Sequence, residues 1–131
     1  QENRAGNVIF TGSIPHRQLI NSDLIPSADV FITPSKTENQ PMSVLEAMAF
    51  GLPIIGVKAL GMPELVKHGK NGFLAKQDDP KSLAKHSIKL INNPKLIKKQ
   101  GQTSLKIIKQ FSLTKTAEKI EKIYEKTARE K

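Results

Sequence analysis

Residues 29–57 read DVFITPSKTENQPMSVLEAMAFGLPIIGV and decide the fold class. The apolar runs at 29–35 and 52–57 contain many β-branched residues, which is typical of strands. Between them the pattern predicts a helix with Pro41 at its first position and Gly51 just after its end. Two strands joined through a helix are normally parallel strands of one sheet. The stretch therefore predicts an α/β fold.

The same alternation continues on both sides of this unit. The expected elements are strands at 7–12 and 72–76, short helices within 13–28 and at 61–69, a helix after the cap Asp79, a helix at 96–111 with a weak point at Gly101, and a last helix capped by Ser112. Short apolar strands separated by helices favour a parallel sheet with helices on both faces. We interpret residues 1–131 as one Rossmann-like domain that ends in a helical segment from about residue 79.

The composition excludes several classes of protein. The chain has no cysteine, so it has no disulfide, no thiol nucleophile and no thiolate metal site. No apolar run approaches the roughly 18 residues that a membrane-spanning helix needs. No signal peptide is visible at the start, so we expect a cytoplasmic protein.

The net charge of +9 lies in the C-terminal part of the chain. Residues 1–80 carry 7 basic and 8 acidic residues, whereas residues 81–131 carry 14 basic and 4 acidic residues. This excess either covers solvated helix faces or attracts the protein to an anionic surface, such as the inner face of a membrane. Nucleic acid is not an expected partner, because the chain has one Tyr and no Trp for stacking on bases.

Two carboxylates, Glu38 and Glu46, lie on either side of the predicted start of the 41–50 helix. That helix is apolar nearly all round, so we expect it to be buried, and a buried carboxylate needs a partner. A helix N-terminus also offers free N–H groups and a positive dipole end to a phosphate. Two interpretations stay open. The carboxylates bind hydroxyls on both sides of a diphosphate, or Glu46 makes an internal salt bridge and Glu38 is a surface residue.

These residues carry a family resemblance. SKTENQPMSVLEAMAFGLPII, at 35–55, resembles the Glu-x7-Glu signature of retaining glycosyltransferases of the GT-B fold, of the family 4 or group 1 type. GMPELVKHGKNGFLAKQDDPKSLAK, at 61–85, is similar to the Gly-x-x-Glu-Leu stretch of those enzymes and the Asn-Gly turn beyond it. VIFTGSIP, SADVFITPS and the terminal FSLTKTAEKIEKIYEK extend the resemblance over nearly the whole chain. It implies the C-terminal, donor-binding half of a GT-B enzyme.

The resemblance also implies roles for individual residues. Glu38 would be the catalytic-site carboxylate that contacts the donor sugar, and Glu46 would hold the ribose of the nucleotide. The remaining donor-binding positions would be Gln40, main-chain groups at Met42 and Ser43, and main-chain groups at Ser13 and Ile14 near the base. No metal and no cofactor is expected. Asp78 and Asp79 are interpreted as a helix cap, and the three histidines, His16, His68 and His86, as ordinary exposed residues.

The sequence departs from the family pattern in three respects. Gln40 and Pro41 stand where an aromatic residue and Gly are usual, and Leu60 stands where the first of two glycines before the Pro-Glu helix is usual. The Arg and Lys that such enzymes use against the diphosphate would lie before residue 1. We therefore expect that the first part of this domain and an N-terminal acceptor domain precede the chain.

The sequence thus predicts the donor domain of a glycosyltransferase that binds a nucleoside diphosphate sugar for retaining transfer to an unknown acceptor. We expect this domain to be inactive alone. A cell-envelope glycan or glycolipid would suit as acceptor. The alternatives are a nucleotide-sugar-binding module without turnover and a basic surface-binding protein. The sequence names neither the sugar nor the base. An exposed sheet edge would favour self-association.

Overall fold

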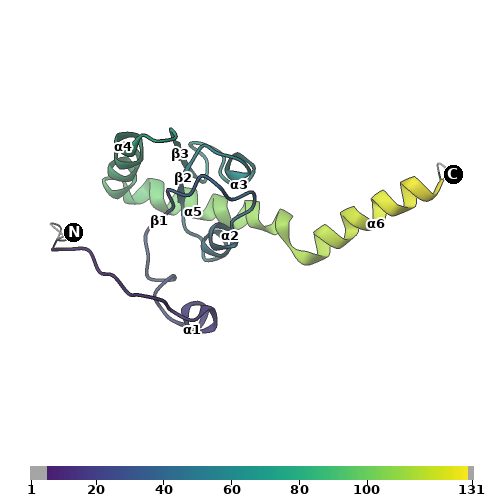
Figure 1. The fold of residues 1–131 in the computed structure, drawn as a ribbon, viewed down its shortest axis with the longest axis horizontal. Helices are drawn as coiled ribbons and strands as arrows, with labels where there is room; N and C mark the ends of the chain where they lie inside the picture. Colours follow the sequence, from purple (N-terminus) through teal and green to yellow (C-terminus); the bar gives the residue numbers. More distant parts are fainter. Residues whose placement is uncertain (1–5, 130–131) are drawn as a thin grey trace.

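The computed structural model describes residues 6–129 (Figure 1). Its elements are α1 (His16–Asn21), β1 (Phe31–Ile32), α2 (Met42–Ala49), β2 (Ile54–Val57), α3 (Met62–Leu65), β3 (Gly72–Ala75), α4 (Pro80–Ile91), α5 (Pro94–Ile108), the 3-10 turn η1 (Lys109–Phe111) and α6 (Leu113–Arg129). The strands form one parallel sheet in the order β1-β2-β3. The register places Phe31 beside Ile54 and Ile54 beside Gly72. The predicted α/β fold is confirmed.

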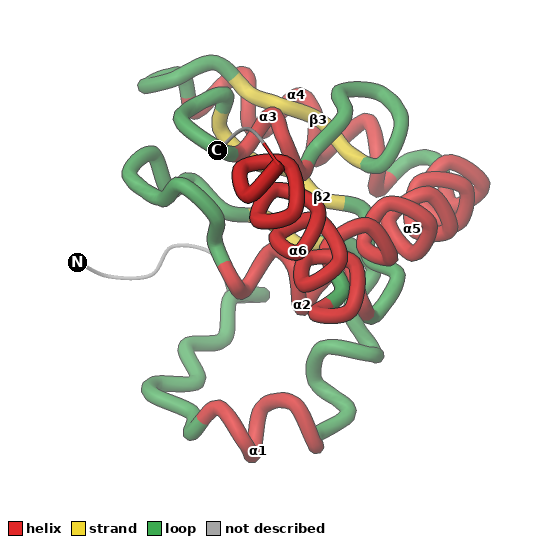
Figure 2. Tube along the Cα trace, turned by 90° about the vertical axis from the view of Figure 1, so that its right-hand side faces the viewer, coloured by secondary structure: helices red, strands yellow, loops and turns green. Residues whose placement is uncertain are grey.

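The central strand β2 separates two apolar cores. Ile54 belongs to a core that α2 and α3 cover, whereas its neighbour Ile55 belongs to a second core with Leu90 of α4. Successive side chains of a strand point to opposite faces, so one strand supplies both cores. Figure 2 shows α2 and α4 on opposite sides of the strands, as Figure 1 does. Helices on both faces of the sheet were predicted, and this prediction is confirmed.

Helix α5 packs on both cores and approaches the turn after α2 closely at a pair of glycines. Ile97 near its start packs on the core under α4, and Ile107 near its end packs on the core under α2. Gly101 lies between them, and a Cβ built there would stand 2.1 Å from the carbonyl oxygen of Gly51. The sequence predicted a weak point at Gly101, which is wrong. The helix is continuous, and the glycine permits a backbone contact that no side chain would allow.

Residues 7–12 do not form the predicted strand. Ile9 and Phe10 are 87% and 82% exposed, and no strand in the described chain lies beside them. A strand needs hydrogen bonds from a neighbour as well as suitable residues, and here that neighbour is absent from residues 6–129. The predicted strand at 29–35 is shorter than expected, because only Phe31–Ile32 pairs with β2.

Helix α6 extends away from the sheet (Figure 1) and contacts η1. Its start agrees with the prediction, since the Ser112 hydroxyl accepts a hydrogen bond from the Lys115 N–H at 3.4 Å. Its apolar side chains do not pack on the described domain, because Ile120 and Tyr124 are exposed. Within residues 6–129 no helix combines the length and apolar content that crossing a bilayer requires.

Polar contacts and a glycine fix the turns around α3. The buried amide of Asn71 accepts the Lys67 N–H at 2.7 Å and donates to the Leu65 carbonyl at 3.1 Å. On the other side of α3, a Cβ at Gly61 would lie 1.5 Å from the Asn39 carbonyl oxygen. Gly61 therefore permits a close backbone approach between this turn and the loop before α2. Leu60 adopts a left-handed conformation, with φ of 42°.

His86 is half-buried, so the prediction that it is an ordinary exposed residue is wrong, whereas His68 is exposed as predicted. The His86 ring stacks on Phe73, with ring centroids 4.9 Å apart and planes at 4°. The His68 ring meets His86 edge-on at 5.4 Å, and its Nδ1 accepts the Leu74 N–H at 3.0 Å. The Lys89 ammonium lies 4.8 Å from the centre of the Phe73 ring. This cluster joins α4 to β3 and to the turn before it.

We expect Gly61→Ala to destabilise the fold and Leu60→Gly to be nearly neutral. The new methyl group must displace the backbone at Asn39, which costs about 1–3 kcal/mol of unfolding free energy. Leu60→Gly relieves the left-handed conformation by about 1 kcal/mol, and the greater freedom of the unfolded chain offsets this gain. Urea unfolding of both variants measures the difference. Equal unfolding free energies would contradict the close approach at Gly61.

We expect acid to destabilise the protein partly through His86. Burial lowers the pKa of His86 below its ordinary value of 6.5, and repulsion from His68, Lys85 and Lys89 adds to this. The unfolded chain therefore binds the proton first, so the unfolding free energy falls as the pH drops from about 6.5 towards the lower folded pKa. Urea unfolding at several pH values checks this. In His86→Gln the dependence should be weaker, and an unchanged dependence would exclude His86 as its source.

Candidate functional site

The candidate site lies at the carboxyl end of the parallel strands. The loops that follow β1 and β3 meet the end of β2 there, which is where open α/β sheets bind ligands. A cavity of about 230 Å³ opens at this edge. Its lining includes Pro34 and Lys36 after β1, Val57 of β2, and Lys76, Asp78 and Asp79 after β3. The site therefore has contributions from all three strand ends.

Glu38 lies exposed in the loop between β1 and α2. The Ser35 hydroxyl donates to its Oε1 at 3.2 Å, and the Ser35 N–H donates to the Thr33 hydroxyl at 3.3 Å. The same loop packs its Asn39 carbonyl on Gly61. Glu38 thus stands on a loop that is fixed at both ends, and its carboxylate faces solvent.

The start of α2 leaves backbone donors open. Pro41 is the cap residue, with no side-chain cap hydrogen bond, although the sequence placed it at the first helical position. The N–H groups of Val44 and Leu45 donate to the Pro41 carbonyl. No described residue accepts a hydrogen bond from the N–H groups of Met42 and Ser43, both of which are exposed. Gln40 is exposed beside them. This end of α2 offers the donors that an anion requires.

Helix α2 is buried on one face only. Val44, Ala47 and Met48 are buried in the core, as predicted, and Gly51 ends the helix with φ of 77°. Met42, by contrast, is 65% exposed on the opposite face. The expectation of a helix buried all round is therefore wrong. The start of α2, where Met42 is exposed, is therefore open to solvent.

Glu46 is half-buried and pairs with His16. The distance from His16 Nε2 to Glu46 Oε1 is 2.7 Å across a separation of 30 residues. This contact is the internal salt bridge of the second interpretation when His16 is protonated, and the exposed position of Glu38 also agrees with that interpretation. Sequence reasoning missed His16 because a histidine at the start of a short helix carries no periodic or spacing signal.

Ser13 and Ile14 lie just before α1, in the same segment as His16. The contact between His16 and Glu46 therefore brings this segment to α2. Ser13 is exposed and Ile14 is half-buried. Of the sequence-predicted residues, one group follows β1 and runs into α2: Glu38, Gln40, Met42, Ser43 and Glu46. The second group, Ser13 and Ile14, comes from a segment remote in sequence.

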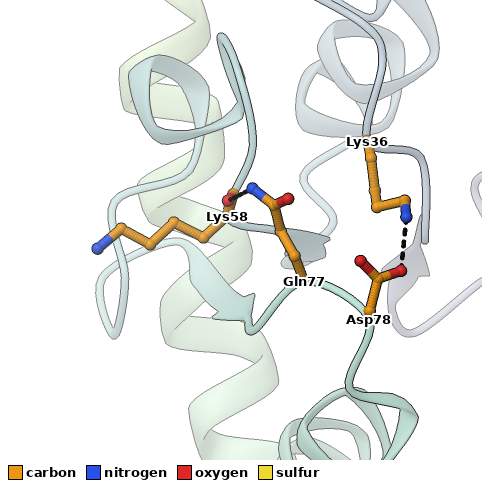
Figure 3. A network of polar contacts seen from close by, with 4 residues as sticks. All are labelled: Lys36, Lys58, Gln77 and Asp78. Carbon is orange, nitrogen blue, oxygen red and sulfur yellow. Dashed lines mark hydrogen bonds and ion pairs between the residues drawn. The ribbon is translucent and has the colours of Figure 1, made fainter.

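A lysine that the sequence analysis did not single out enters the cavity. The Lys36 ammonium pairs with the Asp78 carboxylate (Figure 3). Beside this pair the Gln77 side chain donates to the Lys58 carbonyl oxygen at 2.9 Å. Asp79 accepts the Ser82 N–H at 2.9 Å, so the prediction that it caps α4 is confirmed. Asp78 instead forms its ion pair with Lys36 in the loop after β1. Its position shortly after the end of β3 is the sequence feature that could have indicated this role.

The described residues contain no group of three or more His, Cys, Asp or Glu side chains arranged to hold a metal ion. The polar groups around the start of α2 include the carboxylates of Glu38 and Glu46 and open backbone donors, and the Lys36–Asp78 pair lies in the cavity at this edge of the sheet. These groups suit a ligand that combines hydroxyls with an anionic centre, because carboxylates accept from hydroxyls and N–H groups donate to oxyanions.

Comparison with known proteins shows which family the chain is related to. The family described as glycosyl transferases group 1 matches residues 1–107. An uncharacterized glycosyltransferase of Haemophilus influenzae is 38% identical over 93 residues, covering 70% of this chain and 26% of that protein. The N-acetyl-alpha-D-glucosaminyl L-malate synthase of Bacillus anthracis is 31% identical over 104 residues, covering 79% of this chain and 27% of that protein.

A solved structure supports the fold. Sucrose-phosphate synthase from Thermosynechococcus elongatus superposes with a TM-score of 0.71 and 23% identity, over 79% of this chain and 26% of that one. The likeness concerns the fold alone and agrees with the expected GT-B architecture. The chain spans about a quarter of the length of these proteins. Since the family match covers residues 1–107 of 131, the chain belongs to the group 1 glycosyl transferases.

Proposed function

We propose that this chain is the donor-binding part of a longer glycosyltransferase, of the hexosyltransferase type. It would bind a nucleoside diphosphate sugar and serve retaining transfer of the sugar to an acceptor. The observation that carries the proposal is the placement of Glu38 and Glu46 on either side of the open N-terminus of α2, at the carboxyl edge of the sheet. Membership of the glycosyl transferase family supports it.

The diphosphate would bind at the start of α2. The N–H groups of Met42 and Ser43 have no partner among the described residues, and the helix dipole adds a partial positive charge there. Pro41 supplies no N–H, but a residue at the cap of a helix has no intrahelical acceptor for one. The start of α2 therefore keeps enough donors for one phosphate group.

The two carboxylates would bind hydroxyls on opposite sides of the diphosphate. Glu38 would accept from hydroxyls of the donor sugar and is the catalytic residue of this proposal, because it alone would touch the reacting sugar. Glu46, behind the first turn of α2, would accept from the ribose. The segment at Ser13 and Ile14 would supply main-chain contacts to the base, since His16 brings that segment to Glu46.

Catalysis would consist mainly of positioning and of electrostatic help to the leaving diphosphate. Fixed donors aimed at a developing negative charge stabilise it without reorganisation. In this chain those donors are the backbone N–H groups at the start of α2. No bound metal and no cofactor is required in this proposal. The acceptor, its domain and any attachment to an anionic membrane through the basic C-terminal part belong to the longer protein.

The carboxylate pair gives a first test by isothermal titration. Glu46→Gln should weaken binding of UDP or GDP and of the matching sugar nucleotide alike, whereas Glu38→Gln should weaken only the sugar nucleotide. Loss of a hydrogen bond to a charged group costs about 1.5–3 kcal/mol, or about 10- to 150-fold in affinity. Glu64→Gln, at an exposed position in α3, is the control. Equal effects of both substitutions on the plain nucleotide would refute the assignment.

The isolated chain gives a second test. It should bind donor with an affinity near millimolar, about −4 kcal/mol, and release no nucleoside diphosphate above background in a donor-turnover assay. Transfer needs donor and acceptor held in register and a cleft closed to water. β1 is also an edge strand of the described sheet, so light scattering should detect species larger than a monomer. Clear transfer by this chain alone would overturn the proposal that it is one part of the enzyme.

A further inference from the structure

The His16–Glu46 contact joins two parts of the molecule that share few other contacts. Residues 13–29 make no other hydrogen bond or ion pair to a described residue after position 29. Helix α1 contains no buried residue, and Figures 1 and 2 show it apart from the sheet. Ile25 adds an apolar contact to the core beneath α2. The His16–Glu46 contact is therefore the polar contact that holds this segment against the body.

We infer that His16 is a positioning residue for nucleoside recognition, acting through Glu46; this rests on the proposed function. An ionised carboxylate only accepts hydrogen bonds, so the His16 Nε2–H donates to Glu46 Oε1. The second carboxylate oxygen, Oε2, accepts from no described residue. The contact fixes the rotation of the carboxylate and leaves Oε2 for a ribose hydroxyl.

The backbone holds His16 in place for this role. His16 is the first residue of α1, and Pro15 before it is the cap residue, with φ of −56°. The Pro15 carbonyl accepts hydrogen bonds from the N–H groups of Gln18 and Leu19, both at 2.9 Å. The fixed φ of Pro15 and the two hydrogen bonds that its carbonyl oxygen accepts restrict the position of the His16 backbone. The imidazole therefore approaches Glu46 from a defined direction.

The same contact couples two parts of one ligand. Ser13 and Ile14, the proposed base contacts, precede His16 by three and two residues. When His16 is bound to Glu46, these main-chain groups stand at a set distance from the proposed ribose site. A ligand that carries both a ribose and a base gains affinity from this fixed distance, whereas a ligand that has only the two phosphates does not. His16 should therefore favour nucleoside diphosphates over inorganic pyrophosphate.

The test compares UDP, GDP and ADP with inorganic pyrophosphate by isothermal titration on the full chain. His16→Ala should weaken the best-binding nucleoside diphosphate about tenfold and leave pyrophosphate unchanged. His16→Gln, whose amide can donate to Glu46, should restore most of the affinity. Arg17→Ala, at the next exposed position of α1, is the matched control. Adding His16→Ala to Glu46→Gln should cause little further loss, because both act through one contact.

The possible outcomes distinguish failure of the proposed function from failure of the inference about His16. If no nucleoside diphosphate binds the unmodified chain, the proposed function fails and this inference fails with it. If Glu46→Gln weakens the nucleotide and His16→Ala does not, only the inference is overturned. Equal loss of nucleotide and pyrophosphate in His16→Ala, or tighter nucleotide binding, would likewise overturn it, since His16 would then act on the fold or block the site. Circular dichroism of His16→Gln shows whether the fold is kept.

Discussion

The two-sided burial of β2 is the constraint on which the other elements depend. Ile54 and Ile55 are fully buried in different cores, so both faces of a four-residue strand must be covered. Helices α2 and α3 cover one face and α4 the other. Parallel strands need crossovers of this kind, because their ends lie at opposite edges of the sheet. The loops that leave the carboxyl edge are then brought together there, and this produces the candidate site.

Helix α2 has to serve both the core and the site. One face, with Val44 and Met48, fills the core and fixes the position of the helix. The first turn stays open, with exposed residues and backbone donors that no described residue uses. Gly61 has no side chain, so the loop between β1 and α2 can pack its Asn39 carbonyl closely against it. A rigid core face beneath an open end is the arrangement that preorganised binding requires.

The sequence correctly predicted features that depend on a few neighbouring residues, such as helix caps and helix ends. Asp79 as a cap and Gly51 as a left-handed helix end follow from one or two residues and their backbone preferences, and both are confirmed. The strand at 7–12 failed because pairing depends on a neighbour that the local sequence does not contain. Gly101 and His16 were misjudged for a related reason: their roles come from contacts with residues 30 or more positions away, which no periodicity reveals.

The position of α5 in the chain has a consequence for the order of folding. The two cores on either side of β2 are complete only when residues 94–108 have been synthesised, because α5 packs on both of them. Until then the emerging chain exposes the apolar residues of β2 and α2, and such surfaces favour aggregation. The backbone contact between Gly51 and Gly101 then closes the structure. Any substitution that slows this closure would prolong the time during which chaperones have to protect the growing chain.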